Sequence, residues 1–329
     1  MLRFIVRRLL VAVPLVLGVL TLVFVLVETT PGDPADLVLG DRPVPPEVRE
    51  RIERAYGFDR PPLERYAHWM SSLLFRGELG WSTSRSRPVT QLLADTLPPT
   101  LLLTGIALLL HVLVGVVLGV VSAARRGRWP DRVVTLGSLT LYAMPTFWLG
   151  LMAILVFTYG LSLFPGSSMH SVGAEQWPLW RQWLDTLWHL ALPAGVLALS
   201  SAAAMTRFVR AGVLEALAQE FIRAARARGV GGGRVMLAHA LRNALGPVIT
   251  LVGISLPILV SGSLIVEVVF AWPGMGRLTY DAIMAKDLAV VLITTLMAAM
   301  LVVLGNLAAD VALAAVDPRI RLVDDGASK

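Results

Sequence analysis

The segment LLVAVPLVLGVLTLVFVLV, residues 9–27, contains no charged residue and is long enough to cross a lipid bilayer as a helix. Fifteen of its residues are Leu, Val or Phe, and each favours membrane insertion by roughly 0.3–0.6 kcal/mol. Insertion is therefore favourable despite Pro14 and Gly18. Because the segment is too long for the apolar part of a signal peptide and no small-residue cleavage site follows it, we interpret it as a retained membrane anchor.

Segments of the same kind recur along the chain, which has 329 residues and a mean hydropathy of +0.70. Only 16% of the residues are charged, whereas soluble globular proteins carry about 25%. The sequence therefore predicts an all-α fold, a polytopic membrane protein with six transmembrane helices. The five further predicted spans lie within 96–124, from about Val133 to the turn FPGSS at 164–168, and at about 186–206, 243–266 and 288–309.

This pattern divides the chain into four parts. They are the N-terminal transmembrane helix 1–27, an extracytoplasmic segment 28–95, a core of five spans at 96–316 with a cytoplasmic connection at 207–242, and a cytoplasmic tail 317–329. Within the second part, PPEVRERIERAYG (45–57) and PPLERYAHWMSSLLFRG (61–77) are typical of short amphipathic helices. These helices either pack against the spans or present a surface to an extracytoplasmic partner.

Lys and Arg are distributed unevenly among the connections between the predicted spans. The two termini and the connections after the second and fourth spans together hold seventeen, whereas the two short connections on the other side hold three. Because connections rich in Lys and Arg remain in the cytoplasm, both termini are predicted to be cytoplasmic. The same distribution accounts for the sequence pI near 10.3, so we predict no nucleic-acid partner.

Several protein classes are disfavoured by residue patterns that the sequence lacks. It has no Cys, and no two of its five His lie at metal-ligand spacing. No Asp, Glu, Lys or Arg lies near the middle of a span, which argues against an ion-coupled carrier. The patterns GxxxxGK[ST], GxSxG and HExxH are also absent. We therefore predict no catalytic residue, cofactor or metal site, and any ATP that drives this protein is hydrolysed by another polypeptide.

Two features of the spans have both a structural and a functional interpretation. His111, deep in the second span, is either hydrogen-bonded inside the helix bundle or part of a proton relay, and we favour the first. Four tryptophans beside the fourth span either anchor the chain at the membrane interface or stack against a solute, and we favour anchoring. They are Trp177, Trp180, Trp183 and Trp188.

The connection 207–242 has the pattern of an ordered amphipathic segment. Apolar residues continue the helical period beyond the fourth span, which predicts that this helix extends into the cytoplasm. In FIRAARARGVGGG (221–233), Phe221, Ile222 and Ala225 share one helical face. Gly229 suits the left-handed residue that ends a helix, and the three following glycines permit a tight reversal. The sequence predicts a short helix below the membrane, which binds either anionic lipid head groups or a soluble partner.

The stretch EFIRAARARGVGGGRVMLAHALRNALGPVIT (220–250) resembles the EAA loop, the cytoplasmic signature of ABC importer permeases. The family's Glu-Ala-Ala-x-x-x-Gly spacing falls on Arg223, Ala224, Ala225 and Gly229. Arg replaces Glu at the first position, which looks typical of the peptide and nickel branch, where the acidic residue comes earlier, here at Glu220. Four more segments, 7–35, 142–157, 266–283 and 317–322, are similar to the B-type permease subunit of dipeptide, oligopeptide or nickel importers.

This resemblance implies a type I ABC importer in a bacterial or archaeal cytoplasmic membrane. The implied partners are a second homologous permease, in a heterodimer, two cytosolic ATPase subunits and an extracytoplasmic solute-binding protein. The chain would form half of the pathway for a peptide, a nickel complex, glutathione or an oligosaccharide. An ion-coupled secondary transporter and a scaffold without a transport role are the alternatives. In the family a coupling helix sits in a groove of the ATPase, which implies docking roles for Glu220, Phe221, Arg223, Ala224, Ala225, Arg226 and Gly229.

Overall fold

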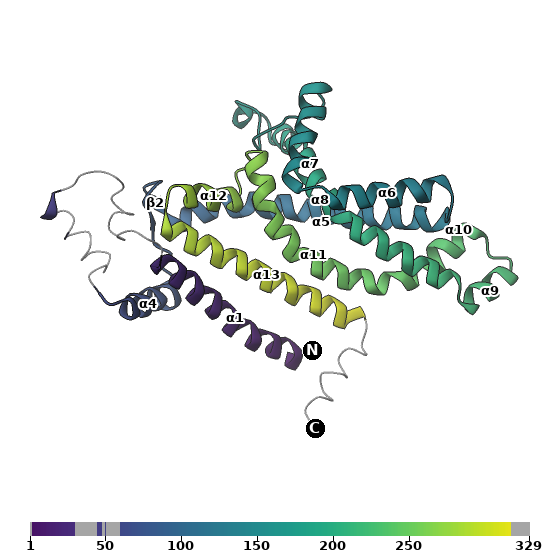
Figure 1. The fold of residues 1–329 in the computed structure, drawn as a ribbon, viewed down its shortest axis with the longest axis horizontal. Coiled ribbons are helices and arrows are strands. Elements are labelled where there is room, and N and C mark those ends of the chain that lie inside the picture. The colour runs from purple at the N-terminus through teal and green to yellow at the C-terminus, as the bar shows by residue number, and fades with distance from the viewer. Residues whose placement is uncertain (1, 30–44, 48–49, 51–59, 317–329) are drawn as a thin grey trace.

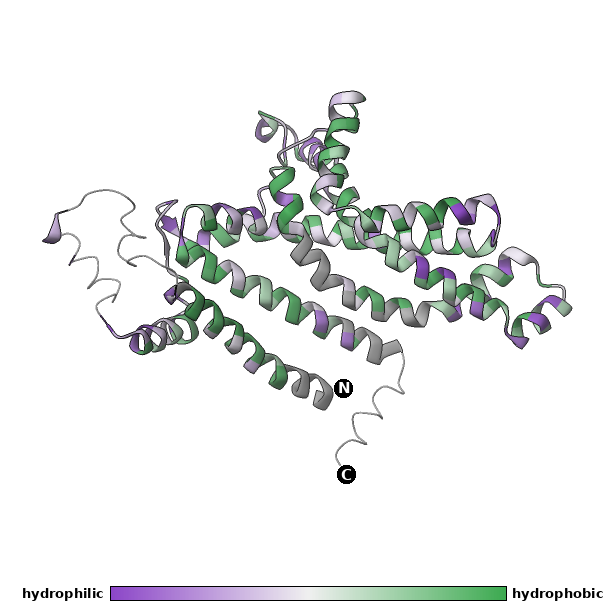
Figure 2. Cartoon of the chain, viewed as in Figure 1, coloured by the Kyte–Doolittle hydropathy of each residue, from purple (hydrophilic) through white to green (hydrophobic). Residues whose placement is uncertain are grey.

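Five of the six predicted spans lie within single long helices of the computed structural model, which describes residues 2–29, 45–47, 50 and 60–316 (Figure 1). The coloured parts of the long helices are mostly hydrophobic, and hydrophilic residues are frequent near α9 at one end and near α4 and α12 at the other (Figure 2). We call these the α9 end and the α12 end. The long helices are α1 (Leu2–Glu28), α5 (Val89–Ala124), α8 (Leu179–Leu217), α11 (Arg242–Val269) and α13 (Leu288–Val316).

Shorter elements connect these helices. Two short strands pair antiparallel, with Trp81 opposite Pro88 and Ser82 opposite Arg87. The shorter elements are α4 (Pro62–Ser71), η1 (Ser72–Arg76), β1 (Trp81–Ser82), β2 (Arg87–Pro88), α6 (Trp129–Ala143), α7 (Thr146–Ala153), η2 (Ile154–Gly160), η3 (Ala174–Gln176), α9 (Glu220–Ala227), α10 (Gly232–Arg234), η4 (Val235–Leu241) and α12 (Met275–Met284).

The third predicted span is not one continuous helix. Helix α6 and the pair formed by α7 and η2 are bent by 109° where Met144 and Pro145 separate them. Proline has no backbone N–H and disfavours helical geometry in the residue before it, and Met144 is extended, with φ −82° and ψ 134°. The prediction of a single helix from Val133 onward is therefore wrong, and the proline explains the break.

Within the described part of the chain, three helices are each long and apolar enough to cross a membrane. They are α5, α8 and residues 288–308 of α13, and the bent pair is a fourth if its two halves form one span. The apolar part of α1, Leu10–Leu26, is shorter. Six remains the predicted number of spans.

Helices α5 and α8 pack closely because α5 presents glycines one helical turn apart. A Cβ atom added at Gly115 would lie 2.4 Å from Met205 Cγ, and one at Gly119 would lie 2.7 Å from Val209 Cβ. The Cβ atom added at Gly119 would also lie 2.9 Å from the backbone oxygen of Thr206. Small residues at this spacing are typical of membrane helices whose backbones approach each other.

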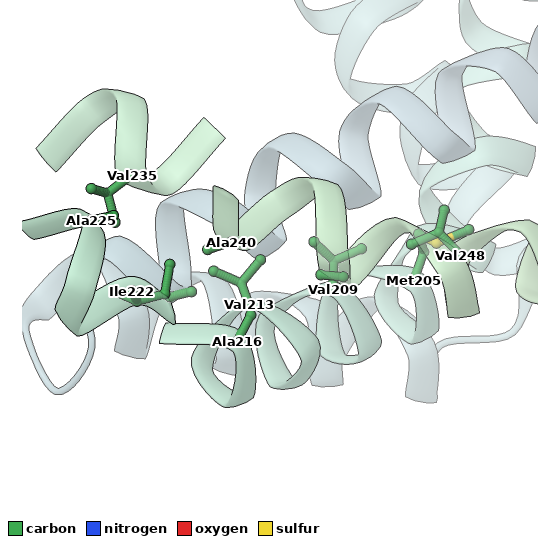
Figure 3. Packing of buried hydrophobic residues seen from close by; sticks show 11 residues of the cluster. Met205, Val209, Val213, Ala216, Ile222, Ala225, Val235, Ala240 and Val248 are labelled. Atoms are coloured by element: carbon green, nitrogen blue, oxygen red, sulfur yellow. The ribbon is translucent and has the colours of Figure 1, made fainter. Parts of the chain in front are cut away.

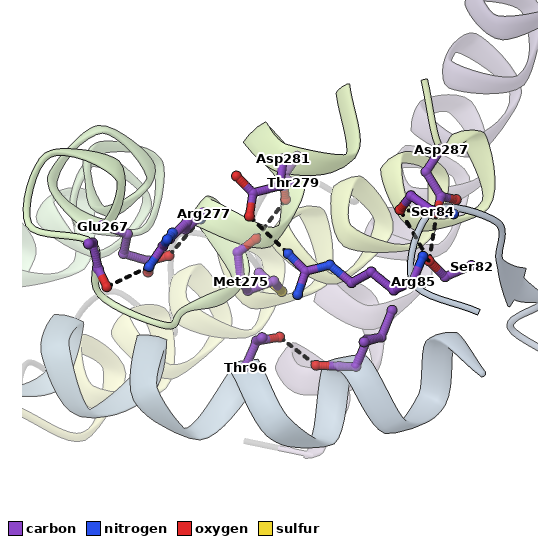
Figure 4. A network of polar contacts seen from close by, with 12 residues as sticks. Ser82, Ser84, Arg85, Thr96, Glu267, Met275, Arg277, Thr279, Asp281 and Asp287 are labelled. Carbon is purple, nitrogen blue, oxygen red and sulfur yellow. Dashed lines mark hydrogen bonds and ion pairs between the residues drawn. The ribbon is translucent and has the colours of Figure 1, made fainter. Parts of the chain in front are cut away.

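At the α12 end, two buried carboxylates join segments that are distant in sequence (Figure 4). Glu267 at the end of α11 accepts hydrogen bonds from the Thr100 hydroxyl at 2.8 Å and the Arg277 backbone N–H at 3.0 Å. A Cβ atom at Gly274 would lie 2.4 Å from the Glu267 carboxyl group, which explains the glycine there. Asp287, before α13, accepts hydrogen bonds from the hydroxyls of Ser82 and Ser84 at 2.6 and 2.8 Å.

Replacing Asp287 by alanine is expected to destabilise the protein by about 3 kcal/mol, because the buried Ser82 hydroxyl and the Ser84 hydroxyl would lose a charged acceptor. The matched control is Asp281→Ala, which breaks the exposed ion pair with Arg85 and should cost less than about 1 kcal/mol. Thermal unfolding of the detergent-purified protein would measure both changes. Equal losses of stability in the two variants would contradict the role assigned to Asp287.

The short helix α4 packs on the end of α1. The Tyr66 hydroxyl hydrogen-bonds with Thr21 at 2.7 Å, and Trp69 stacks on Phe24 with ring centroids 6.0 Å apart. Elements α4 and η1, with Gly77 in left-handed conformation at the end, confirm the helix predicted within 61–77. Most of the other predicted short helix, 45–57, lies outside the described residues.

Candidate functional site: a projecting helix at one end of the bundle

Two residues separate the end of α8 from the start of α9, and α8 extends beyond the fourth predicted span as the sequence indicated. Val209 and Val213 on α8 continue the buried face of the span, and both are fully buried. Ala218 and Gln219 then form the turn, with the Ala218 N–H donating to the Glu215 carbonyl. Figure 1 shows α9 at the far end of the bundle, so α8 connects this helix directly to the membrane-length part of the chain.

The C-terminus of α9 is closed by backbone hydrogen bonds around a left-handed glycine. Gly229 has φ +78°, and its N–H donates to the carbonyl of Arg226 at 2.9 Å. The Val230 N–H donates to the carbonyl of Ala225 at 3.2 Å. These two bonds form the Schellman motif and satisfy carbonyls that the helix itself leaves without partners. The predicted role of Gly229 as the left-handed residue is confirmed.

The inner face of α9 is anchored to the rest of the chain by two apolar side chains. Ile222 and Ala225 are 0% and 1% exposed, and they belong to one cluster with Val213 of α8 and Val235 of η4 (Figure 3). Complete burial of a side chain such as Ile222 contributes roughly 1.5–3 kcal/mol. This contact fixes an eight-residue helix that would be unstable in isolation.

The outer face of α9 is exposed, mostly basic, and contains a small residue near its centre. Phe221, which was predicted to share one helical face with Ile222 and Ala225, is 41% exposed whereas those two residues are buried. Ala224 is exposed as well, so another surface could approach the backbone there. Glu220 and Arg223 form an ion pair at 3.0 Å with highly exposed side chains, a geometry worth less than about 1 kcal/mol. The pair therefore leaves both groups accessible to another molecule.

Six of the seven residues with an implied docking role are exposed, and Ala225 is the exception. The exposed residues are Glu220, Phe221, Arg223, Ala224, Arg226 and Gly229. The Ala225 side chain faces the chain's own interior, because it lies one helical turn from Ile222. The structure therefore places Ala225 in the support of α9 and not on its outer face.

The glycine run after α9 is partly helical. Gly231 is extended, with φ −60° and ψ 146°, and α10 begins at Gly232. Of the three glycines that were predicted to permit the reversal, only Gly231 precedes α10, and Gly232 and Gly233 lie within this helix. The left-handed Gly229 and the extended Gly231 reverse the chain, and the π-helical segment η4 returns it to α11.

Sequence reasoning missed a buried ion pair near α9. Asp131, in the first turn of α6, accepts hydrogen bonds from Arg210 Nε at 2.8 Å and from a second nitrogen of the Arg210 guanidinium at 2.9 Å. The Ser122 hydroxyl at the end of α5 donates to the same carboxylate, and the Gly127 N–H donates at 2.8 Å. The available signal was that Asp131 is the only acidic residue among the arginines of this connection.

The polar groups of the spans show no arrangement suited to metal binding. Among residues 2–29, 45–47, 50 and 60–316, no group of three or more His, Asp or Glu side chains could hold a metal ion. His111 is buried on α5, with its Nε2 atom 3.1 Å from the Ser255 hydroxyl of α11. The interpretation of His111 as hydrogen-bonded inside the bundle is confirmed.

A cavity of about 630 Å³ lies beside the start of α8, among the predicted interfacial tryptophans. The Arg181 guanidinium lies 4.0 Å from the ring centroid of Trp177, and Asp185 accepts hydrogen bonds from the backbone and hydroxyl of Ser171. Trp188 also lines the cavity and is 55% exposed. The exposure of this tryptophan fits the favoured interpretation of an aromatic belt at the membrane interface.

Comparison with known proteins matches most of the chain to one family. Residues 115–322 match the family described as the binding-protein-dependent transport system inner membrane component. Residues 1–104 match the companion family that describes the N-terminal part of such components. The oligopeptide transport system permease protein AppB of Bacillus subtilis (strain 168) is 38% identical over 321 residues, covering 97% of this chain and 99% of that protein. The glutathione transport system permease protein GsiC of Escherichia coli (strain K12) is 36% identical, covering 98% and 99%.

A solved structure of the methionine ABC transporter MetNI, in an inward-facing conformation, shares the fold. One of its chains superposes with a TM-score of 0.53 and 20% sequence identity, covering 69% of this chain and 97% of that one. The apolar helices and the curated relatives together show a multi-pass membrane protein. With a family match over most of its length and relatives that match it almost end to end, the chain belongs to the binding-protein-dependent transport system inner membrane components, as a B-type permease subunit of an ABC importer.

Proposed function

We propose that this chain forms half of the pathway for a peptide or a related small solute, and that α9 is the coupling helix through which an ATPase moves the spans. Two relatives with over 35% identity are permeases for oligopeptides and for glutathione, which is itself a small peptide. A permease of this family is the transport component, so ATP hydrolysis belongs to separate subunits.

The proposed arrangement in the membrane has six spans, with α9 and both termini in the cytoplasm. The concentration of Lys and Arg in the connections on one side supports this orientation. In Figure 1, the N-terminal end of α1 and the C-terminal end of α13 are the ends of these two helices that lie nearer to α9. The proposed partners are a similar but non-identical permease, two ATPase subunits and a solute-binding protein on the outer face.

The observation that supports this proposal most strongly is the two-sided structure of α9. Its inner face packs through Ile222 and Ala225 into the same buried cluster as Val213 of α8, so we expect α9 and the end of α8 to move together. Its outer face presents Phe221 and Ala224 between charged side chains. A force applied to the outer face would therefore reach α8, which is a continuous helix of 39 residues.

Replacing Ala224 by glutamate is expected to lower the amount of ATPase that co-purifies with the chain at least about tenfold, because a long charged side chain would block close approach to α9. Ala224→Ser, which keeps the side chain small, is the matched control and should retain the ATPase. The purified chain alone should hydrolyse no ATP. Full retention of the ATPase by Ala224→Glu would contradict the docking role of this face.

An ion-coupled secondary transporter is not favoured, because the chain belongs to a family of ABC importer permeases. Uptake that continues after an uncoupler collapses the proton gradient, while ATP is maintained, is the result expected for an ATP-driven importer. Binding-protein-dependent uptake into membrane vesicles would likewise exclude a scaffold without a transport role.

A further inference from the structure

The ion pair between Asp131 and Arg210 lies where α8 leaves the span and approaches α9. Arg210 is seven residues before the last residue of α8, and its guanidinium contacts both oxygens of the Asp131 carboxylate. The same carboxylate accepts hydrogen bonds from Ser122 of α5 and from the backbone of Gly127. The buried Asp131 carboxylate, at the start of α6, therefore contacts the end of α5, the α5–α6 turn and the C-terminal part of α8.

The geometry of this pair restricts movement more strongly than an exposed ion pair would. The Asp131 side chain is 7% exposed, and two contacts from different nitrogens of Arg210 to its two oxygens fix the orientation of the guanidinium plane. Breaking the pair would leave the buried Asp131 carboxylate without its counter-charge, which is strongly unfavourable. A sliding or bending motion of α8 at Arg210, relative to α5 and α6, would have to break these contacts.

We propose that Asp131 and Arg210 are positioning residues that clamp the base of the coupling helix to the α5–α6 turn. The clamp makes α9, the end of α8 and this turn move as one rigid body when the ATPases close. This inference rests on the proposed function of α9 and adds the path by which its displacement reaches α5 and α6. Without the clamp, α8 bends between its span and α9, and the displacement is not passed to the other helices.

Distance measurements in the complete importer test the clamp directly. Because the chain contains no Cys, two introduced cysteines can be spin-labelled without background from this subunit. Arg126→Cys places one label on the α5–α6 turn, and Ala218→Cys places the other between α8 and α9; both positions are exposed. The distance between the labels is recorded without nucleotide and after trapping with ATP and vanadate.

In the labelled chain that keeps Asp131 and Arg210, the mean distance between the two labels is expected to be the same in both states. In the double variant Asp131→Asn with Arg210→Gln, which removes both charges together, the distance distribution should shift on trapping and become about twofold broader. Arg210→Lys, which keeps the charge but not the fork of two contacts, should give an intermediate width. Glu215→Gln removes an exposed charge further along α8 and should behave as the unmodified protein.

Two further readouts separate failure of the clamp from failure of the proposed function. The double variant should retain the ATPase on co-purification, and its ATP hydrolysis should lose stimulation by the solute-binding protein and fall to about the basal rate. A distance that changes on trapping in the unmodified protein, or that stays constant in the double variant, overturns the clamp. An unmodified chain that retains no ATPase refutes the proposed function and the clamp with it.

Discussion

Replacing Ala225 by glutamate is expected to remove the ATPase from the purified importer, although the Ala225 side chain does not reach the outer face of α9. The alanine is 1% exposed and lies in the cluster with Ile222 and Val235. A carboxylate placed there has no partner, and burying an unpaired charge costs several kcal/mol. The helix should therefore detach from η4 and lose the orientation that docking requires, with at least about a tenfold loss of retained ATPase.

Amide hydrogen exchange distinguishes this effect from direct interference with docking. Ala225→Glu should accelerate exchange across Glu220–Ala227, because it frees the helix from its support. Ala224→Glu should release the ATPase without changing exchange in α9, because its side chain lies on the outer face. Ala225→Ser is the size-matched control and should retain both protection and ATPase. If Ala225→Glu keeps the exchange protection of the unmodified protein, the support assigned to this residue is wrong.

Replacing Gly119 by leucine is expected to destabilise the folded protein by about 3 kcal/mol or more, the largest effect expected for the membrane-length helices. Even a Cβ atom at Gly119 would lie 2.9 Å from the backbone oxygen of Thr206, and a backbone atom cannot move aside as a side chain can. Helices α5 and α8 would have to separate, which disrupts the packing of Val209 as well. The part of α8 that leads to α9 would then lose its close contact with α5.

Gly105 provides the matched control on the same helix. A Cβ atom at Gly105 would meet no atom within 4 Å, so Gly105→Leu should change stability by less than about 1 kcal/mol. Thermal unfolding in detergent and the yield of monodisperse protein would measure both variants. A Gly119→Leu protein with the unfolding temperature of Gly105→Leu would contradict the close approach of α5 and α8.

Local sequence patterns predicted the features that depend on neighbouring residues. The apolar runs placed five long helices, since membrane insertion depends on composition over about 20 residues. The end of α9 was predicted for a similar reason, because Gly229 adopts a left-handed conformation at little steric cost. The extension of α8 beyond its span followed from the helical period of Val209 and Val213.

The remaining features depend on contacts between residues that are far apart in the sequence. Asp131 and Arg210 are separated by 79 positions. The isolated acidic residue among arginines marks Asp131 as unusual, but it does not indicate which arginine Asp131 contacts. The burial of Ala225 depends on Val235, which is placed beside it only after the chain has reversed. The break at Pro145 could have been predicted from the proline itself. The residues on both sides are apolar, however, and hydropathy alone does not reveal that a backbone N–H donor is missing.

The bend between α6 and α7 also implies that this subunit is incomplete by itself. Pro145, at the bend, is exposed on the surface of the isolated chain. A helix that stops leaves its final carbonyl groups without donors, and hydrocarbon tails supply none. Irregular backbone is tolerated at membrane depth only where protein or water covers it. We therefore expect that lipid does not surround this corner in the assembled importer, and that a neighbouring subunit or a hydrated channel borders it.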